Sequence, residues 1–293
     1  MKVAVVAHRK KSFGGGLGEL RRLLADAGVD IVRWDEVTKS RKAPPYLRKA
    51  LKAGPDVIFV WGGDGMVQRS VNELAGHDVT MAVLPAGTAN LFAHNLGVPT
   101  DLPGAVAAGL HGDRRTIDVG RLNGEAFAVM AGLGFDAAMI RDAGGLKDRL
   151  GRAAYVWSGS QQLGAKPFTA RIKTDGVTWY DGPASCVLLG NVSDLFAGVE
   201  IFPDLRLDDA RLDVAVVTAD GYLDWIRVLT RAVAGTAPSS PLAHTTQARK
   251  IKVKLDRKVR YELDGGDRGK VREITVKALP KALTVCVPRP DGP

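Results

Sequence analysis

A glycine-rich turn with one carboxylate follows the most apolar strand that the sequence predicts. The run Val57 to Trp61 is continuously apolar, as in a parallel strand that is covered on both faces, and Gly62-Gly63-Asp64-Gly65 comes directly after it. Ligands of an open α/β sheet bind at the carboxyl ends of strands, where glycine lets backbone N–H groups approach phosphate oxygens. The turn therefore predicts a phosphate site.

Asp64 would repel a phosphate group unless a cation lies between them. Because Mg²⁺ prefers carboxylate, phosphate and water oxygens, an aspartate in this turn favours metal-assisted nucleotide chemistry. The alternative is a tight strand-to-helix connection in which Asp64 is only the N-cap of the helix that follows. This turn alone supports both interpretations equally.

A second turn of the same kind follows the next predicted strand. Val79 to Leu84 is again apolar and ends in Pro85-Ala86-Gly87-Thr88-Ala89-Asn90, which supplies a glycine, a hydroxyl and an amide. Two such turns at neighbouring strand ends can hold one nucleotide between them. The basic, glycine-rich stretch from His8 to Gly16 also suits phosphate, or is a flexible connection. Thr38 follows another strand and offers a hydroxyl, or lies in a solvated loop.

Composition restricts the class of protein. The chain has 293 residues, of which 45% are hydrophobic and 25% charged, as in a globular protein of two domains. The net charge of +9 favours anionic partners such as nucleotides or acidic lipid surfaces. No zinc-finger spacing, RNP-type strand or basic heptad helix accompanies it, so a nucleic-acid partner is not expected.

The sequence also indicates the compartment. The first apolar run is too short for a signal peptide, and no apolar stretch reaches membrane-spanning length. Cys186 and Cys286 lie in apolar, strand-like surroundings, which predicts buried thiols in a reducing cytosol.

The elements that must position these turns alternate between strand and helix as far as Leu110. The pattern predicts strands at Lys2 to Ala7 and Val29 to Trp34, and helices from Leu17 to Gly28, from Pro44 to Lys52 and after Asp101. This alternation is typical of an α/β domain with a parallel sheet.

From Thr116 onward, short strands and turns replace the alternation. Asn123-Gly124 between apolar runs is a hairpin signal, Phe168 to Tyr180 is predicted as a strand, and Asp264-Gly265-Gly266-Asp267 as a tight turn. Two helices are expected, at Leu146 to Leu163 and Gly221 to Ala234. We expect residues 1–116 to form the α/β nucleotide-binding domain and residues 117–280 a β-rich domain, with residues 281–293 packing back on the first.

One predicted strand has a basic face. Lys250, Lys252 and Lys254 alternate with Ile251, Val253 and Leu255. Such a face is usually only solvated, although it can also contact acidic lipid headgroups without anchoring the protein firmly.

Taken together, the motifs resemble those of the diacylglycerol kinase catalytic family, the lipid kinases that include sphingosine kinase and the bacterial YegS-like enzymes. The chain has the GGDG turn at Gly62, and Pro85 to Asn90 is similar to the P-x-G-T-x-N element. Further matching blocks, in family order, are Ile117-Asp118-Val119-Gly120, Gly132-Leu133-Gly134-Phe135-Asp136 and residues 202–213. The resemblance covers nearly the whole chain.

The resemblance implies an NAD kinase-like α/β domain, a C-terminal antiparallel β-sandwich domain, and ATP bound in the cleft between them. Asp64 and Asp118 would position a catalytic Mg²⁺ through waters, and Asp264 would be the base. A structural cation would bind Asp209 and backbone oxygens of Arg206 and Arg211. The residues that would hold the nucleotide are Thr38, Gly62, Gly63, Asp64, Gly65, Met66, Val67, Gln68, Gly87, Thr88 and Asn90.

The chain departs from the family pattern at several of these positions. Met66 and Gln68 replace a usual Thr and Asn after the GGDG turn, and Leu91 replaces a frequent Asp. Ala210 stands where the family has glycine. At the D-G-E motif Asp264 is kept, but Gly266 has replaced the Glu.

The resemblance implies ATP-dependent transfer of the γ-phosphoryl group to a lipid hydroxyl, with diacylglycerol converted to phosphatidic acid for phospholipid biosynthesis. An NAD kinase-like enzyme and a catalytically degenerate nucleotide- or lipid-binding protein are the alternatives, the latter motivated by Met66, Leu91 and Gly266. We expect a cytoplasmic protein with peripheral contact at the inner face of the membrane, and a homodimer is compatible with the sequence. The lipid pocket is expected along Gly132 to Phe135, Leu146 to Leu163 and Leu195 to Phe202.

Overall fold

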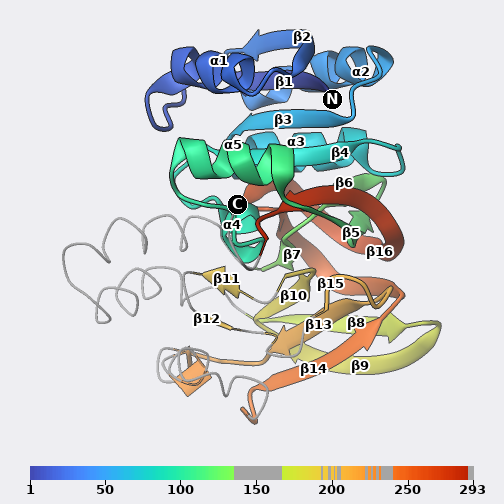
Figure 1. Ribbon diagram of the computed structural model, residues 1–293. Coiled ribbons are helices and arrows are strands. Elements are labelled where there is room, and N and C mark those ends of the chain that lie inside the picture. The colour runs from blue at the N-terminus through green and yellow to red at the C-terminus, as the bar shows by residue number, and fades with distance from the viewer. Residues whose placement is uncertain are drawn as a thin grey trace. The chain divides into compact units, whose positions relative to one another are not determined.

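The chain divides into two compact units, which we call the α/β unit and the β unit. The α/β unit is Met1–Val119 with Pro280–Pro293, and the β unit is Gly120–Leu279. The computed structural model describes residues 1–134, 167–192, 194–196, 199–200, 202, 206–221, 224–225, 227–228, 231 and 240–289. Figure 1 shows the elements of both units.

The α/β unit is built on a parallel sheet in the order β4-β3-β1-β2. The end of the chain extends this sheet, since Thr284 and Val285 pair in parallel with Thr80 and Met81 of β4. Every residue of β3 is buried, as the continuous apolar run predicts. The four strands are β1 (Lys2–His8), β2 (Asp30–Val37), β3 (Val57–Gly62) and β4 (Thr80–Pro85).

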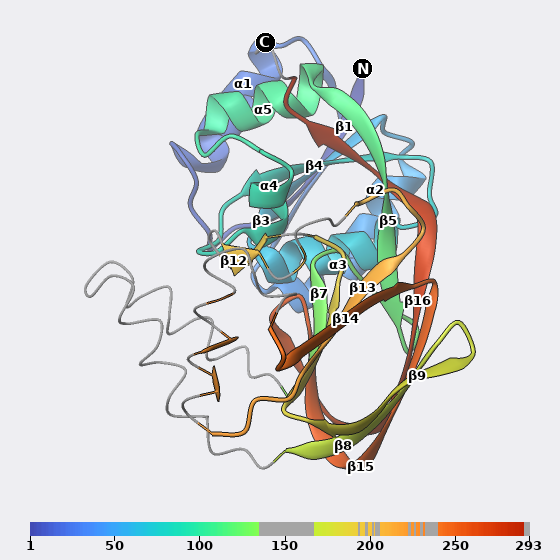
Figure 2. The same ribbon diagram turned by 90° about the horizontal axis from the view of Figure 1, so that it is seen from below.

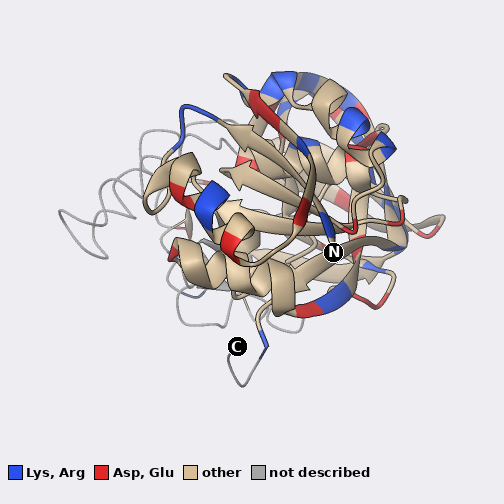
Figure 3. Ribbon diagram, turned by 45° about the horizontal axis from the view of Figure 1, so that its top comes forward, with Lys and Arg blue, Asp and Glu red and all other residues tan. Residues whose placement is uncertain are grey.

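Helices cover both faces of this sheet. Helix α1 packs with α5, and α2 packs with α3 on the opposite face (Figure 2). Charged residues lie mainly on the helices and loops around the strands (Figure 3), and β3 and β4 carry none. The helices are α1 (Gly16–Asp26), η1 (Ser40–Lys42), α2 (Pro44–Lys52), α3 (Asp64–Leu74), α4 (Leu91–Asn95) and α5 (Leu102–His111). The predicted strand and helix alternation is confirmed, including the cap at Asp101, which accepts a hydrogen bond from Gly104 N (2.7 Å).

The β unit is antiparallel and follows the order β14-β13-β10-β7-β15-β16, with β8 pairing to β15 and β9 to β8. Its core is a cluster of buried side chains that includes Phe127, Phe168, Val187, Val214 and Ile251. Strands β5 (Asp113–Leu122) and β16 (Gly266–Val287) contribute residues to both units. The other strands are β6 (Glu125–Phe127), β7 (Met130–Leu133), β8 (Phe168–Thr174), β9 (Val177–Ala184), β10 (Cys186–Gly190), β11 (Asp194–Phe196), β12 (Val199–Glu200), β13 (Leu212–Val217), β14 (Ala243–Ala248) and β15 (Lys250–Leu263).

The predicted fold class, an α/β domain followed by an antiparallel β domain, is confirmed. The turns at Asn123-Gly124 and Asp264-Gly265 are also confirmed, with both residues of each pair at positive φ, as a two-residue hairpin requires. One prediction is wrong, because Phe168 to Tyr180 is not a single strand. Asp175 and Gly176 adopt positive φ and reverse the chain between β8 and β9.

Two further predictions concern helices and thiols. The helix expected at residues 146–163, and most of the helix expected at 221–234, lie outside the described residues.

Cys186 and Cys286 are buried and free, as predicted, and burial raises the pKa of their thiols to about 12 and about 11. Within the described part of the chain, no helix is long and apolar enough to span a membrane.

Gly109 lets α5 approach the sheet closely. A Cβ added there would overlap the ring of Phe59 in β3, which is fully buried. We expect Gly109→Ala to lower the free energy of unfolding by about 1–2 kcal/mol, because the overlap outweighs the better helix propensity of alanine. Gly18→Ala in α1 is the control, since its Cβ meets nothing within 4 Å, and it should raise stability by about 0.5 kcal/mol. Urea unfolding measures both, and equal effects would contradict the close approach.

Candidate functional site

The two glycine turns touch at Gly63 and Gly87. A Cβ built on Gly63 would lie 2.8 Å from the Cα of Gly87, and a Cβ on Gly87 would overlap Gly63 in turn. Both residues must therefore be glycine for the turns after β3 and β4 to meet. Their contact leaves a stretch of backbone without side chains at the carboxyl edge of the sheet, where phosphate groups bind in α/β proteins.

Asn90 holds the second turn in shape. Its backbone is left-handed, with a φ of 49°. The side-chain Oδ1 accepts a hydrogen bond from Gly87 N (2.8 Å), and Nδ2 donates to Gly87 O (3.0 Å) and Pro85 O (3.3 Å). Because one side chain satisfies both backbone groups of Gly87, the orientation of this peptide is fixed.

Asp64 connects the two turns. Its Oδ2 accepts a hydrogen bond from Asn90 N (3.0 Å) and its Oδ1 accepts one from Leu91 N (2.7 Å). The alternative in which Asp64 caps its own helix is wrong, since Gly63 is the N-cap of α3 and the carboxylate instead caps α4. Burial raises the pKa of the Asp64 carboxyl, against the hydrogen bonds from the backbone, which lower it.

The remaining residues predicted to hold the nucleotide differ in how far they are exposed. Thr88 and Gly65 are exposed and Thr38 is half-buried, so all three are accessible. Met66, Val67 and Gln68 are buried in α3, with at most 4% exposure. The amides of Met66 and Val67 also donate to Gly63 O, at 2.8 and 3.1 Å. These three residues therefore contribute to the site by holding the glycine turn in place, through buried side chains and backbone hydrogen bonds.

The basic loop after β1 is tied to the end of β3. Trp61 Nε1 donates to Lys11 O (3.1 Å), and the rings of Trp61 and Phe13 meet edge to face, with centroids 5.9 Å apart. Arg9 and Lys10 are exposed on this loop. The alternative of a flexible connection does not fit these contacts. Sequence reasoning missed the anchoring role of Trp61, although a tryptophan at the end of a predicted strand was a usable signal.

Ser40 follows the same strand as Thr38, and the sequence offers it as a second hydroxyl that can meet a nucleotide or lie in a solvated loop. A Cβ on Gly65 would lie 3.5 Å from Ser40 Oγ, so this hydroxyl faces the glycine turn. The serine begins η1, just after the loop that carries Thr38. The loop after β2 thus contributes a hydroxyl to the same edge of the sheet.

Asp118 lies on β5 and is almost completely buried, with 1% exposure. Its Oδ1 accepts a hydrogen bond from Lys281 N (2.7 Å), whose residue has a left-handed φ of 49°. Carboxylate oxygens suit a hydrated Mg²⁺ ion, so the residue types of Asp64 and Asp118 fit a role in holding a cation through its waters.

Asp264 is the buried anchor of a β-unit turn. Its Oδ1 accepts hydrogen bonds from Val129 N and Met130 N, both at 2.9 Å, and its Oδ2 accepts one from Ala128 N (3.0 Å). Asp264 N donates to Met130 O (2.9 Å). The carboxylate, 6% exposed, thus joins the β15–β16 turn to the segment between β6 and β7.

Arg268 occupies the space beside Gly266. It pairs with Glu125 through two hydrogen bonds of 2.7 and 2.9 Å, and it donates to Gly266 O (3.0 Å). A Cβ on Gly266 would lie 2.5 Å from Arg268 Nη1. Asp267, the next residue along the chain, is exposed, and its carboxylate contacts Arg260 (3.2 Å) and Gly269 N (2.8 Å).

The segment predicted to hold a structural cation forms a tight turn. Asp209 Oδ1 accepts a hydrogen bond from Arg211 N (2.9 Å), and Arg206 pairs with Asp208 at 3.4 Å. Ala210 has a φ of 62°, which is the conformation that a glycine adopts without strain. In the described residues, no group of three or more His, Cys, Asp or Glu side chains has the arrangement of a metal site.

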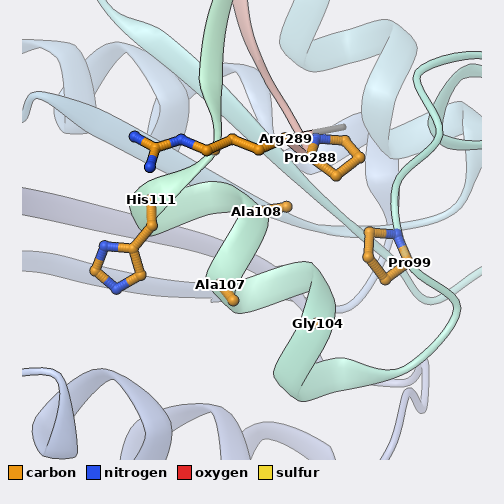
Figure 4. Close-up of a pocket in the computed structure, with 8 residues that line it drawn as sticks. Pro99, Gly104, Ala107, Ala108, His111, Pro288 and Arg289 are labelled. Atoms are coloured by element: carbon orange, nitrogen blue, oxygen red, sulfur yellow. The ribbon is translucent and has the colours of Figure 1, made fainter. Parts of the chain in front are cut away.

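A separate hollow of about 90 Å³ lies beside α5 (Figure 4). It is lined by Pro99, Ala108 and His111 and by Pro288 and Arg289 near the end of the chain, among others. None of the predicted site residues lines it. We therefore do not include it in the candidate site.

The fold and the turns define a class, a kinase-type phosphate site in an α/β domain followed by an antiparallel β domain. Residues 5–122 match the diacylglycerol kinase catalytic domain, and residues 129–287 match the YegS C-terminal NAD kinase beta sandwich-like domain. The chain belongs to the diacylglycerol kinase catalytic-domain family, and its homologues support a lipid kinase that acts as a phosphotransferase with ATP as co-substrate.

Individual proteins show how far the likeness extends. The chain is 32% identical to "Diacylglycerol kinase" of Bacillus subtilis over 215 residues, which is 72% of this chain and 71% of that protein. A putative diacylglycerol kinase from Bacillus anthracis matches with a TM-score of 0.80 and 24% identity, over 100% of this chain and 98% of the other. An NAD kinase from Archaeoglobus fulgidus in complex with ATP matches with a TM-score of 0.55 and 12% identity, over 98% of this chain and 93% of the other. The two structures establish likeness of fold alone.

We expect Asp264→Asn to lower the free energy of unfolding by about 2–3 kcal/mol. The side-chain NH₂ group of asparagine, which replaces one carboxylate oxygen, cannot accept a hydrogen bond. At least one buried backbone N–H therefore loses its charged partner. Asp267→Asn is the matched control, because that carboxylate is exposed and its loss should change stability by less than about 0.5 kcal/mol. Chemical denaturation measures both. Equal stability of the two variants would show that the three amides do not depend on Asp264.

Ala210→Gly should raise the free energy of unfolding by about 1 kcal/mol, because glycine adopts positive φ without the steric cost that alanine incurs. Ala25→Gly in the exposed part of α1 makes the same change at a helical position, and it should lower stability by about 1 kcal/mol. Thermal unfolding distinguishes the two signs. A loss of stability in both variants would mean that the turn at Ala210 is unstrained.

Proposed function

We propose that this protein transfers the γ-phosphoryl group of ATP to the hydroxyl of diacylglycerol, giving phosphatidic acid for phospholipid biosynthesis. The observation that carries this proposal is the contact of Gly63 with Gly87, which offers bare backbone at the carboxyl edge of the sheet. Membership of a lipid kinase family and a relative named diacylglycerol kinase support the choice of acceptor.

The α/β unit, which we assign as the nucleotide-binding domain, holds the ATP phosphates through backbone amides of Gly62, Gly63 and Gly65. Gly87, whose own amide is bonded to Asn90, contributes a surface without a side chain that a phosphate can approach. Thr88 adds a hydroxyl, and Thr38 adds a second from the loop after β2. Positioning and electrostatic stabilisation account for most of the catalysis in phosphoryl transfer, so a rigid backbone site suits this reaction. The α4 cap on Asp64 and the side-chain bonds of Asn90 give the site that rigidity.

We assign the holding of Mg²⁺ to Asp64 and Asp118, through water molecules. When bound, the ion offsets negative charge on the phosphates. Asp118 is buried and Asp64 is half-buried, and burial raises the pKa of the Asp64 carboxyl, as expected for an acid that is partly withdrawn from water. Asp209, with the backbone oxygens of Arg206 and Arg211, is our candidate for a separate structural cation site.

Asp264 remains our candidate for the base of the β unit, which we assign as the lipid-substrate domain. The three backbone amides occupy three of the roughly four lone-pair sites of the carboxylate. In this role the Asp264 carboxylate would accept or orient the proton of the acceptor hydroxyl. The same amides hold the carboxylate in one orientation, which a proton-accepting group requires.

A catalytically degenerate binding protein is the second candidate function. It is favoured by Gly266, where the family has Glu and where Arg268 now fills the adjoining space. In that case the protein would bind ATP or a lipid without turnover. We also propose peripheral contact with the cytoplasmic face of the membrane, because a lipid acceptor must be reached at a membrane surface. A homodimer is a further part of the proposal.

The kinase proposal predicts transfer of label from γ-labelled ATP, with Mg²⁺, to diacylglycerol in mixed micelles. Asp64→Asn should lower kcat/KM by at least about 100-fold, because it removes one charge and one acceptor from the centre of the site. Asp78→Asn is the matched control, since Asp78 is exposed in the loop before β4, and its activity should equal that of the wild type.

Sphingosine and NAD⁺ are tested as acceptors in the same assay. Labelled NADP⁺ instead of labelled lipid would favour the NAD kinase-like alternative. Tight ATP binding without any labelled product would contradict the kinase proposal and support the degenerate binding protein. The melting temperature of each variant is recorded alongside, so that loss of folding is distinguished from loss of catalysis.

A further inference from the structure

Four cationic side chains line a hollow on the β unit. The hollow has a volume of about 190 Å³, and it is lined by Arg171 and Lys173 of β8 and by Lys252 and Lys254 of β15. The lysines of β15 alternate with Ile251 and Val253, which are fully buried, so the cations share the outer face of the sheet. None of the four residues belongs to the candidate site described above.

The strand register brings these cations directly opposite one another. Lys173 of β8 lies opposite Lys252 of β15, and Arg171 lies opposite Lys254. Like charges at directly opposed positions destabilise an antiparallel pair. The β8–β15 ladder therefore carries two neighbouring repulsive pairs, which a bound anion would relieve.

The surrounding carboxylates offset only part of this charge. Glu273 lies 2.7 Å from Lys252 Nζ and 3.8 Å from Lys254 Nζ, and Asp181 lies 2.8 Å from Arg171. The pKa of the Glu273 carboxyl is lowered, chiefly by its hydrogen bond to Lys252. Lys173 forms no ion pair with a carboxylate of the described residues. Two carboxylates against four cations leave an excess of two positive charges.

We propose that this hollow binds a phosphate monoester. A monoester carries about −1.5 to −2 charges near neutral pH, which matches the excess of two positive charges, whereas a phosphodiester or a carboxylate would supply only one. Lysine ammonium groups attract the charge, and the planar guanidinium of Arg171 can donate two parallel hydrogen bonds to phosphate oxygens. The monoester is either a lipid headgroup, such as that of phosphatidic acid, or a small soluble molecule. The inference rests on the hollow and not on the proposed kinase reaction.

The test variant is Lys173→Gln combined with Lys254→Gln. It removes one member of each opposed pair and keeps the Lys252–Glu273 and Arg171–Asp181 ion pairs. Both lysines are exposed, so the variant should fold, with a melting temperature no lower than that of the wild type. The control combines Lys49→Gln with Lys52→Gln, an equal loss of charge on exposed positions of α2.

Binding is measured without ATP to three probes: phosphatidylcholine vesicles with phosphatidic acid, phosphatidylcholine vesicles with phosphatidylglycerol at equal surface charge, and glycerol 3-phosphate in solution. We expect the test variant to lose about thirtyfold in affinity for one monoester probe, since each lysine near an anionic surface contributes about fivefold, and the control to lose little. Loss in the vesicle arm identifies a lipid headgroup, and loss in the solution arm identifies a soluble ligand.

Three results would overturn the proposal. The first is unchanged binding of both monoester probes by the test variant. The second is an equal loss in the control variant, which would indicate attraction by net charge alone. The third is equal binding of the two kinds of vesicle by the wild type together with no binding of glycerol 3-phosphate, because a site matched to two charges should prefer a monoester in at least one arm.

Discussion

The contact between Gly63 and Gly87 is the constraint on which the candidate site depends. Two strand ends can place their turns in contact only if neither turn has a side chain at the contact, and a Cβ on either residue would overlap the other. Asp64 then holds the turns together, because it begins α3 but accepts hydrogen bonds from the first backbone amides of α4. The two turns at this edge of the sheet are therefore bonded to each other, and we expect a change in one turn to disturb the other.

The β unit also contains a carboxylate that holds distant backbone segments together. Asp264, like Asp64, is a carboxylate that accepts hydrogen bonds from the backbone of a distant segment, and Asp264 is the more buried of the two. In both units, an acidic residue whose type suggests chemistry also fixes the chain around it. Loss of activity on replacing either residue therefore does not establish a chemical role unless stability is measured as well, because buried amides left without partners cost free energy of their own.

Much of the fold could be predicted because its signals are local. Continuous apolar runs gave the parallel strands, and pairs such as Asn123-Gly124 gave the hairpins. One local signal was overlooked: Asp175-Gly176 is itself a hairpin signal, and it divides the alternating stretch from Phe168 to Tyr180 into β8 and β9. The partners of Asp64 and Asp264 could not be predicted, since they lie 26 to 27 and 134 to 136 residues away in sequence. Contacts at such separations depend on how the strands are ordered, which no local pattern records.

The departures from the family pattern differ in how much they change the candidate site. Leu91 contributes its backbone N–H to Asp64, and that hydrogen bond is the same whichever side chain the residue carries. Met66 is buried against Gly62, so its side chain packs inside the α/β unit. Gly266 is different, because the space beside it is filled by Arg268, which is held by Glu125. A site formed by backbone tolerates side-chain substitutions that leave its backbone in place. At Gly266 a carboxylate is lost and Arg268 takes the adjoining space. The β15–β16 turn therefore bears more directly than the glycine turns on whether the proposed transfer is catalysed.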